Sequence, residues 1–307
     1  MSLLALPLTF ALFGCDNSAA EALKTCEGGN MEACYRDGHA AAEAARPRFS
    51  DARRAFSNAC MTTHHPQACN ELGGLVRDAK GGPKDIHRAT ELFEIACKGG
   101  EQTACIDLGV LVYAPQQGIG IEPEPGRAVE LFTNACNLVD LDAVSEDEAD
   151  PLAAACRALG RAYEEGKGLE RDRKDPVKAA ELYRKACKAN LSSGCVSAGA
   201  LAERSKRRAD IESAAASYER ACKLDARTGC FELAELHARR AWPDASFSEA
   251  ALNYQRTCSI DPTRGCFEAA ALMQDGKVDA REGEIEYLYN LACEHGHTVA
   301  CTRRHVK

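Results

Sequence analysis

The sequence contains few of the residues that favour β-strands. Aromatic residues make up 6% of its 307 positions, and valine and isoleucine are sparse, whereas alanine is abundant. Because alanine favours helices and β-branched and aromatic residues favour strands, this composition predicts an all-α protein. No basic cluster is longer than RSKRR at 204–208 in a chain of net charge −8. The electrostatic footprint of a nucleic-acid-binding protein is therefore missing.

Several motifs that carry chemistry are also absent. None of the 17 cysteines forms a C-x-x-C pair, which argues against zinc knuckles, a thioredoxin-type redox site and c-type haem attachment. No serine has a lysine three residues later, and S-D-N, K-T-G and H-E-x-x-H do not occur. The signatures of serine β-lactamases and of zincin metalloproteases are therefore missing. We expect no catalytic residues, no metal site and no cofactor.

The only strongly apolar segment lies at the N-terminus. Residues 1–14, MSLLALPLTFALFG, carry no charged side chain and are too short to span a membrane, so they predict a signal peptide. The LFGC sequence that ends at Cys15 resembles a bacterial lipobox, in which the cysteine is lipidated and becomes the mature N-terminus. Residues 15–25 then form a short tether or helix. A buried N-terminal helix over the apolar segment is the alternative.

With Cys15 set aside, the remaining sixteen cysteines fall into eight pairs along the chain. Six pairs enclose seven residues, one encloses eight and one encloses nineteen. The pairs are Cys26/Cys34, Cys60/Cys69, Cys97/Cys105, Cys136/Cys156, Cys187/Cys195, Cys222/Cys230, Cys258/Cys266 and Cys293/Cys301. Successive pairs begin 34 to 39 residues apart once the twelve extra residues of the fourth pair are subtracted, a period typical of a helical-hairpin solenoid. Paired cysteines persist in oxidising compartments, so their even number also favours an exported chain.

Other residues keep the same register as the cysteines. Four positions before the first cysteine of each later pair lies an aromatic residue: Phe56, Phe93, Phe132, Tyr183, Tyr218, Tyr254 or Tyr289. Four positions after the second cysteine lies a small residue: Gly38, Gly73, Gly109, Gly160, Gly199, Ala234 or Ala270. An offset of four places each on one helix face with its cysteine. The small residues indicate a close approach of a neighbouring helix, since a glycine inside a helix costs about 1 kcal/mol relative to alanine.

Each repeat is therefore predicted to contain a helix A, a turn and a helix B. In residues 156–187, CRALGRAYEEG forms helix A and ends at glycine, and VKAAELYRKAC forms helix B. Asp175 precedes Pro176, the order expected of an N-cap and the first residue of a helix. SFSE at 246–249 predicts a capping box before another helix B.

With this repeat period and this pattern of helices, the chain resembles a known repeat family. LGRAYEEGKGLERDRKDPVKAAELYRKAC resembles the Sel-like repeat (SLR), a relative of the tetratricopeptide repeat. The regular C-x7-C pairs are similar to those of the Helicobacter cysteine-rich protein family of secreted SLR proteins. The resemblance covers residues 26–301. It implies an α/α superhelix, a single solenoid over 26–307 with seven hairpins and a disulfide in each repeat.

In that arrangement the cysteine pairs are structural. The first cysteine ends helix B and the second begins the next helix A, so a disulfide closes the connection between two antiparallel helices. Metal ligation and redox chemistry are the alternatives, and the fourth pair is the least certain because its loop encloses the insertion 137–154. This insertion carries six acidic residues between Asp140 and Asp150. We interpret it as a solvated acidic loop, with a calcium loop or a contact for a cationic partner as alternatives.

The resemblance also implies a function. A helical solenoid offers a long concave surface, so we expect a non-enzymatic scaffold that binds a protein or a peptide there. We expect it to be a monomer, attached to a membrane through its N-terminal lipid and exposed to the periplasm or the cell surface. Some Helicobacter cysteine-rich proteins are described as penicillin-binding proteins or weak β-lactamases, so β-lactam binding or hydrolysis is the alternative, on resemblance alone.

Overall fold

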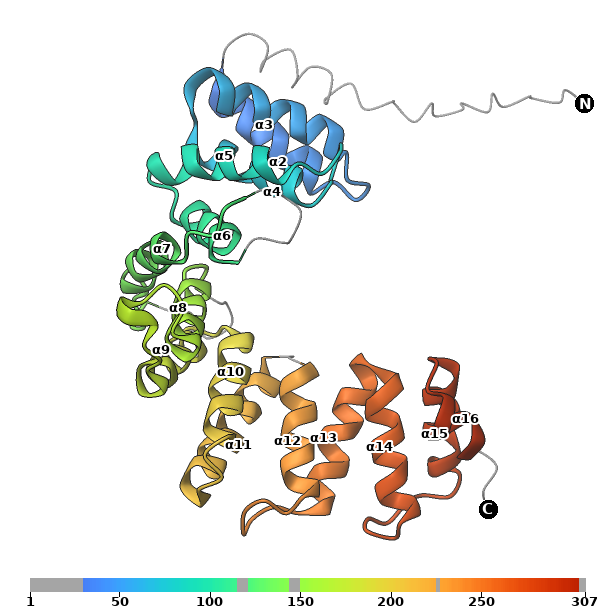
Figure 1. Cartoon of the computed structure of the whole chain (residues 1–307). Helices are drawn as coiled ribbons and strands as arrows, with labels where there is room; N and C mark the ends of the chain where they lie inside the picture. Colours follow the sequence, from blue (N-terminus) through green and yellow to red (C-terminus); the bar gives the residue numbers. More distant parts are fainter. Residues whose placement is uncertain (1–29, 115–120, 144–149, 225–226, 304–307) are drawn as a thin grey trace, which may run out of the picture. The chain divides into compact units, whose positions relative to one another are not determined.

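A computed structural model describes residues 30–114, 121–143, 150–224 and 227–303 of the chain. These residues form fifteen α-helices and one short 3-10 helix (Glu170–Asp172), and they contain no strand (Figure 1). The predicted all-α fold is confirmed over this part of the chain. None of these described helices is long and apolar enough to cross a membrane.

The chain divides into two compact units. The first runs to Leu111, and the second takes in Val112 and Tyr113 and continues from Glu122. The helices that lie in the first unit are α2 (Met31–Ala42), α3 (Phe49–Thr63), α4 (Pro66–Arg77) and α5 (Ile86–Lys98), followed by α6 (Gln102–Tyr113), whose last residues belong to the second unit. The helices of the second unit are α7 (Pro125–Asn137), α8 (Ala153–Glu165), α9 (Pro176–Lys188), α10 (Ser192–Glu203), α11 (Arg208–Lys223), α12 (Arg227–Ala238), α13 (Phe247–Ile260), α14 (Pro262–Gln274), α15 (Glu284–Glu294) and α16 (Thr298–Arg303).

Within each unit, helices that follow one another in the chain pack together. In the first unit α2 packs on α3, α3 on α4 and α4 on α5. In the second unit the same order runs without a break from α7 to α16. The hairpins are α2/α3, α4/α5, α8/α9, α10/α11, α12/α13 and α14/α15. This order of packing is that of an α/α solenoid, as predicted. A single solenoid over 26–307 stays a prediction.

The helices begin and end at the residues that the sequence indicates. The side chain of Asp175 accepts a hydrogen bond from the Lys178 backbone N–H at 2.9 Å, and Pro176 is the first residue of α9. Helix α8 ends at Gly166, whose φ of 80° lies in the left-handed region that glycine adopts without strain. These contacts satisfy backbone groups that would otherwise lack a partner at the helix ends.

The capping box predicted at 246–249 is only half formed. The Ser246 hydroxyl accepts a hydrogen bond from the Glu249 backbone N–H at 3.2 Å, as the motif requires. The Ser246 backbone N–H donates instead to Nδ1 of His237 at 3.3 Å. A buried histidine of α12 therefore takes the place that the sequence assigned to the Glu249 carboxylate.

The core of each hairpin forms where an aromatic ring of helix B lies against a small residue of helix A. A Cβ added to Gly38 would come within 2.4 Å of the Phe56 ring, and one added to Gly160 would come within 2.8 Å of the Tyr183 ring. Such contacts are too short for any side chain. The predicted close approach is thus confirmed, and its partner is the aromatic residue of the same hairpin. Where alanine replaces glycine, as at Ala234, the residue is fully buried.

Basic side chains of helix B tie one repeat to the next in the second unit. Nζ of Lys185 donates to the backbone oxygen of Cys136 at 2.8 Å. One repeat later, Arg220 donates to the backbone oxygen of Cys187 at 3.1 Å and to Oδ1 of Asn190 at 2.9 Å. A cation at a helix C-terminus satisfies exposed carbonyl groups and interacts favourably with the helix dipole.

Candidate functional site

The cysteine pairs close the connections between successive repeats. Seven disulfides lie in the described part of the chain, and each joins the last turn of one helix to the first turn of the next, with Cα atoms 4.4 to 4.8 Å apart. They are Cys60–Cys69, Cys97–Cys105, Cys136–Cys156, Cys187–Cys195, Cys222–Cys230, Cys258–Cys266 and Cys293–Cys301. Cys34 is disulfide-bonded as well. Its expected partner Cys26 and the predicted lipidation site Cys15 lie outside the described residues. The prediction of one disulfide per repeat is confirmed for the seven described pairs.

The fourth pair is bridged despite the insertion that it encloses. The returning arm of the insertion is fixed by the backbone N–H of Asp150, which donates to the carbonyl of Ala189 at the end of α9 at 3.1 Å. The carboxylate of Asp150 accepts from the Leu152 N–H at 2.7 Å, one turn before Cys156. Residues 144–149, which carry three of the six acidic side chains, lie outside the described residues. The solvated-loop interpretation of 137–154 stays a prediction.

The tyrosine hydroxyls of helix B form hydrogen bonds with acidic or amide side chains of helix A. Tyr183 donates to Glu164 at 2.7 Å, and Tyr218 donates to Glu203 at 3.2 Å, from the same positions of two repeats. Burial, followed by the neighbouring carboxylate, raises the pKa of both tyrosines well above the usual value. The register therefore places a neutral phenol and a carboxylate together at the same end of the α8/α9 and α10/α11 hairpins.

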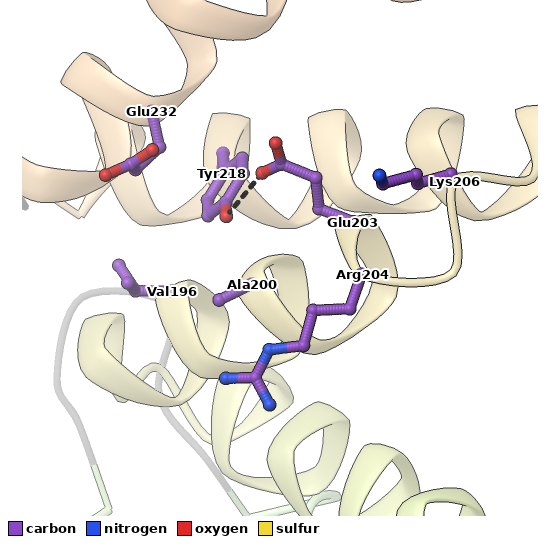
Figure 2. A pocket seen from close by; sticks show the side chains of 7 residues that line it. All are labelled: Val196, Ala200, Glu203, Arg204, Lys206, Tyr218 and Glu232. Atoms are coloured by element: carbon purple, nitrogen blue, oxygen red, sulfur yellow. Dashed lines mark hydrogen bonds between the residues drawn. The ribbon is translucent and has the colours of Figure 1, made fainter.

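Tyr218 also lines an open pocket of about 400 Å³ beside α10, α11 and α12 (Figure 2). We call it the α10–α12 pocket; its lining residues are Val196, Ala200, Glu203, Arg204, Lys206, Tyr218 and Glu232. In the view of Figure 2, Glu203 and Glu232 lie on opposite sides of the Tyr218 ring. An apolar floor with charged groups at its margins is typical of a surface that binds another molecule.

Glu203 and Arg204 of this pocket are each paired with a charged residue outside its lining. Glu203 accepts a hydrogen bond from Arg239 at 2.7 Å in addition to the one from Tyr218. Arg204 forms an ion pair with Glu164 of the preceding repeat. The arginine side chains are more than half exposed, whereas the two glutamates are about one-quarter exposed. In both pairs the carboxylate is thus more buried than the arginine that binds it.

A second pocket of about 170 Å³ lies beside the first, between α12, α13 and α14. We call it the α12–α14 pocket; its lining residues are Arg227, Thr228, Phe231, Glu232, Thr257, Asp261 and Arg264. Arg227 pairs with Asp261 at 2.9 Å, and the Arg264 guanidinium lies over the Phe231 ring, 4.1 Å from its centroid. Glu232 lines both pockets, so the two form neighbouring parts of one surface.

Glu232 differs from Glu203 and Asp261, the other carboxylates that line this surface, both of which are paired with an arginine. Within the part of the chain that the structure describes, its carboxylate makes no hydrogen bond and no ion pair. Burial raises its pKa, and the nearby carboxylates of Glu203 and Glu235 raise it further. Arg239 and Arg264 oppose this shift. Burial of a carboxylate without a partner costs folding free energy. Such a group is therefore a common mark of a binding site, where a ligand supplies the partner.

This surface is not among the sites predicted from the sequence. One signal for it was present: an acidic residue recurs two positions after the second cysteine, as Glu71, Asp107, Glu232 and Glu268. Burial raises the pKa of all four carboxyl groups. Nowhere in the described ranges do three or more histidine, cysteine, aspartate or glutamate side chains form a group that could hold a metal ion.

The stacked hairpins, their small-residue and aromatic contacts and their inter-repeat disulfides define a helical repeat protein. Residues 66–101, 102–140 and 153–191 each match the family model of the Sel1 repeat, so the chain contains three Sel1 repeats. This confirms the predicted Sel-like repeat. The similarity to the Helicobacter cysteine-rich proteins stays a prediction.

Solved structures of other repeat proteins share this fold. A protective antigen of uropathogenic Escherichia coli strains with an SLR fold has a TM-score of 0.68 and 19% identity, over 92% of this chain and 57% of that chain. A Sel1 repeat protein from Oxalobacter formigenes has a TM-score of 0.65 and 17% identity, over 94% of this chain and 79% of that chain. At these identities the likeness shows the fold alone.

Curated relatives of this chain carry a functional name. The chain is 30% identical over 99 residues to human cytochrome c oxidase assembly factor 7. The aligned region covers 31% of this chain and 43% of the human protein, so the chain spans less than half of that relative's length. These comparisons give no support to the β-lactam alternative. The repeat scaffold fits the binding of a protein partner, and the many disulfides indicate an oxidising, extracellular-type compartment.

Proposed function

We propose that the chain is an exported, lipid-anchored scaffold without enzymatic activity, and that it binds a segment of a partner protein at the α10–α12 and α12–α14 pockets. The observation that carries the proposal is the pair of neighbouring pockets along one side of a disulfide-linked solenoid. Successive helices A supply Val196, Glu232 and Arg264, so an extended segment that crosses the repeats contacts each in turn.

The proposed location rests on two features of the chain. Seven disulfides favour an oxidising compartment, since a reducing cytosol keeps thiols reduced. The apolar residues 1–14 and Cys15 supply the expected signal peptide and lipid attachment. In this proposal a lipid on Cys15 holds the solenoid at a membrane surface, where it acts as a monomer.

The name of the human relative suggests a general role, assistance in the assembly of a protein complex, that fits the same surface. Human cytochrome c oxidase assembly factor 7 is named for the assembly of an enzyme complex. We extend to this chain only the step of holding a client protein. A scaffold needs no catalytic group for that step, because specificity comes from shape and charge.

Site-specific photo-crosslinking in the native host tests the proposal. A photoreactive amino acid replaces Val196 or Ala200 in the α10–α12 pocket, and Val177 of α9, which is 69% exposed, serves as the matched control. We expect a discrete protein adduct from the two pocket positions and none from Val177.

Adducts that appear equally at all three positions would contradict a pocket-specific partner. The complete absence of adducts from Val196 and Ala200 would contradict the scaffold function itself.

A further inference from the structure

The structure points to the chemistry of the partner: we propose that Glu232 receives a lysine or arginine side chain of the bound segment. This inference rests on the proposed binding function and deepens it. Glu232 lines both pockets, so a basic side chain that reaches it stands at the centre of the shared surface. The ligand class is therefore a protein segment with an exposed basic residue, and Glu232 is its specificity-determining contact.

The charged groups of this chain that lie near Glu232 are bound to other side chains and not to Glu232. Of the two arginines near it, Arg239 is bound to Glu203 at 2.7 Å and Arg264 lies on the Phe231 ring at 4.1 Å. Glu235, the other nearby carboxylate, accepts the Tyr254 hydroxyl at 2.6 Å. Each of these three neighbours thus has a contact of its own, and a cation from outside meets a carboxylate that is still available.

Close to Glu232 itself the carboxylates favour a cation over an anion, although four basic residues, Arg204, Lys206, Arg227 and Arg264, also line the two pockets. Glu203, Glu232 and Glu235 act on one another through partly buried space, where like charges repel more strongly than in water. An incoming carboxylate would add a fourth negative charge to this group. An incoming ammonium or guanidinium group relieves the repulsion and gains a charge-assisted hydrogen bond.

The basic residues that line the two pockets oppose such a ligand. Arg204 and Arg227 are in ion pairs and Arg264 lies on the Phe231 ring, which leaves Lys206. Lys206 lines the α10–α12 pocket, is exposed and has no ion-pair partner among the described residues. Because it lies in water at the margin, its charge is better screened than that of Glu232. Lys206→Glu should therefore have the opposite effect to Glu232→Gln, since a negative charge at position 206 should attract a basic ligand.

A second carboxylate extends the acidic surface by one repeat. Glu268 of α14 occupies the same position as Glu232 relative to its cysteine. It is half-buried and also lacks a hydrogen bond or ion pair within the described ranges. Burial, and then Glu235, raises its pKa. A segment with two basic residues therefore has two successive contacts to make.

Selection of short random peptides on phage, with the oxidised full-length chain as bait, tests the inference. Peptides that compete with crosslinking at Val196 are synthesised, and their affinity is measured by fluorescence anisotropy. We expect lysine and arginine to be enriched over aspartate and glutamate in these peptides. Loss of one charged hydrogen bond should make Glu232→Gln bind the best peptide roughly tenfold more weakly.

Two further variants make the test independent of folding effects. Glu286→Gln removes an exposed carboxylate of α15 that has no ion pair among the described residues, and it should bind the peptide as the parent chain does. Lys206→Glu should bind it several-fold more tightly, and added salt should reduce that gain. An unfolded variant cannot bind more tightly, so this gain separates charge recognition from stability.

The outcomes separate the two proposals. Pocket-competing peptides without basic residues, or affinities that Glu232→Gln leaves unchanged, would overturn the assignment of Glu232 and leave the scaffold function standing. Tighter binding of acidic peptides, lost in Lys206→Glu, would do the same. Failure to select any peptide that competes at Val196 would contradict both.

Discussion

Gly199 of α10 lies against the ring of Tyr218 of α11, so closely that an added Cβ would come within 2.6 Å of the ring. The hydroxyl of the same tyrosine donates to Glu203 at 3.2 Å, and its ring lines the α10–α12 pocket. Packing within one hairpin and the shape of the pocket therefore depend on one side chain. A change at Gly199 should affect both.

The first prediction concerns this contact. Gly199→Ala should lower the free energy of unfolding by about 1 kcal/mol, because the overpacking cost exceeds the helix-propensity gain of alanine. Gly74 of α4 is the matched control, since a Cβ there meets nothing within 4 Å. Gly74→Ala should raise the free energy of unfolding by about 1 kcal/mol. Urea unfolding followed by circular dichroism measures both; a stabilised Gly199→Ala would contradict the packing described.

The second prediction concerns the disulfides. Removing Cys187–Cys195 as a double alanine variant should cost about 2.5 kcal/mol, and removing Cys136–Cys156 should cost about 3.3 kcal/mol. The difference arises because the sequence separation is 8 in the first pair and 20 in the second, and a longer closed loop restricts the unfolded chain more. Urea midpoints of the oxidised variants measure the costs. A smaller loss for Cys136–Cys156 would contradict this dependence on loop length.

The third prediction concerns pH and Glu232. Its pKa is raised in the folded chain, so its contribution to stability is fully present below its unfolded pKa and is lost as pH rises through its folded pKa. At neutral pH the ionised carboxylate therefore opposes folding among Glu203, Glu235, Arg239 and Arg264. Glu232→Gln should raise the melting temperature by a few degrees or less at pH 7.

The comparison at lower pH completes that prediction. Near pH 4 the parent carboxyl is protonated in the folded chain, so the gain from Glu232→Gln should disappear. Glu286→Gln, which removes an exposed charge, should not raise the melting temperature at either pH. A Glu232→Gln variant that is less stable than the parent at pH 7 would mean that the carboxylate has a stabilising partner.

The fourth prediction concerns the contacts between repeats. Arg220→Met removes the hydrogen bonds to the Cys187 carbonyl and the Asn190 side chain, and should cost about 1 to 2 kcal/mol. Lys223→Met removes only an exposed ion pair with Glu219 on the same helix and should cost less than about 0.5 kcal/mol. Equal losses in the two variants, measured by urea unfolding, would mean that Arg220 does not link the repeats.

The repeat register could be predicted from the sequence because it depends on local spacing. Tyr183 and Tyr218 lie four positions before a cysteine, and that offset alone places their rings on the buried face of helix B. The side chain that accepts each tyrosine's hydrogen bond was harder to predict. Tyr254 donates to Glu235, because Ala238 stands where the other repeats have a longer polar side chain.

The pockets could not be predicted in the same way. They form where the helices of successive repeats meet, so their shape depends on tertiary packing rather than on the pattern within one helix. Glu232 is one of many glutamates in the sequence, and only its surroundings distinguish it: Arg239 is held by Glu203 and Arg264 by the Phe231 ring. The sequence pattern showed that acidic residues recur at this position, but not that Glu232 has no partner.

One disulfide per repeat, formed in an oxidising compartment, is tested most directly by mass mapping of the protein purified from its native host without reduction. We predict that all sixteen paired cysteines are oxidised in the pairs given above and that Cys15 carries a lipid at a new N-terminus. Free thiols spread over several pairs would contradict both the crosslinked solenoid and its export.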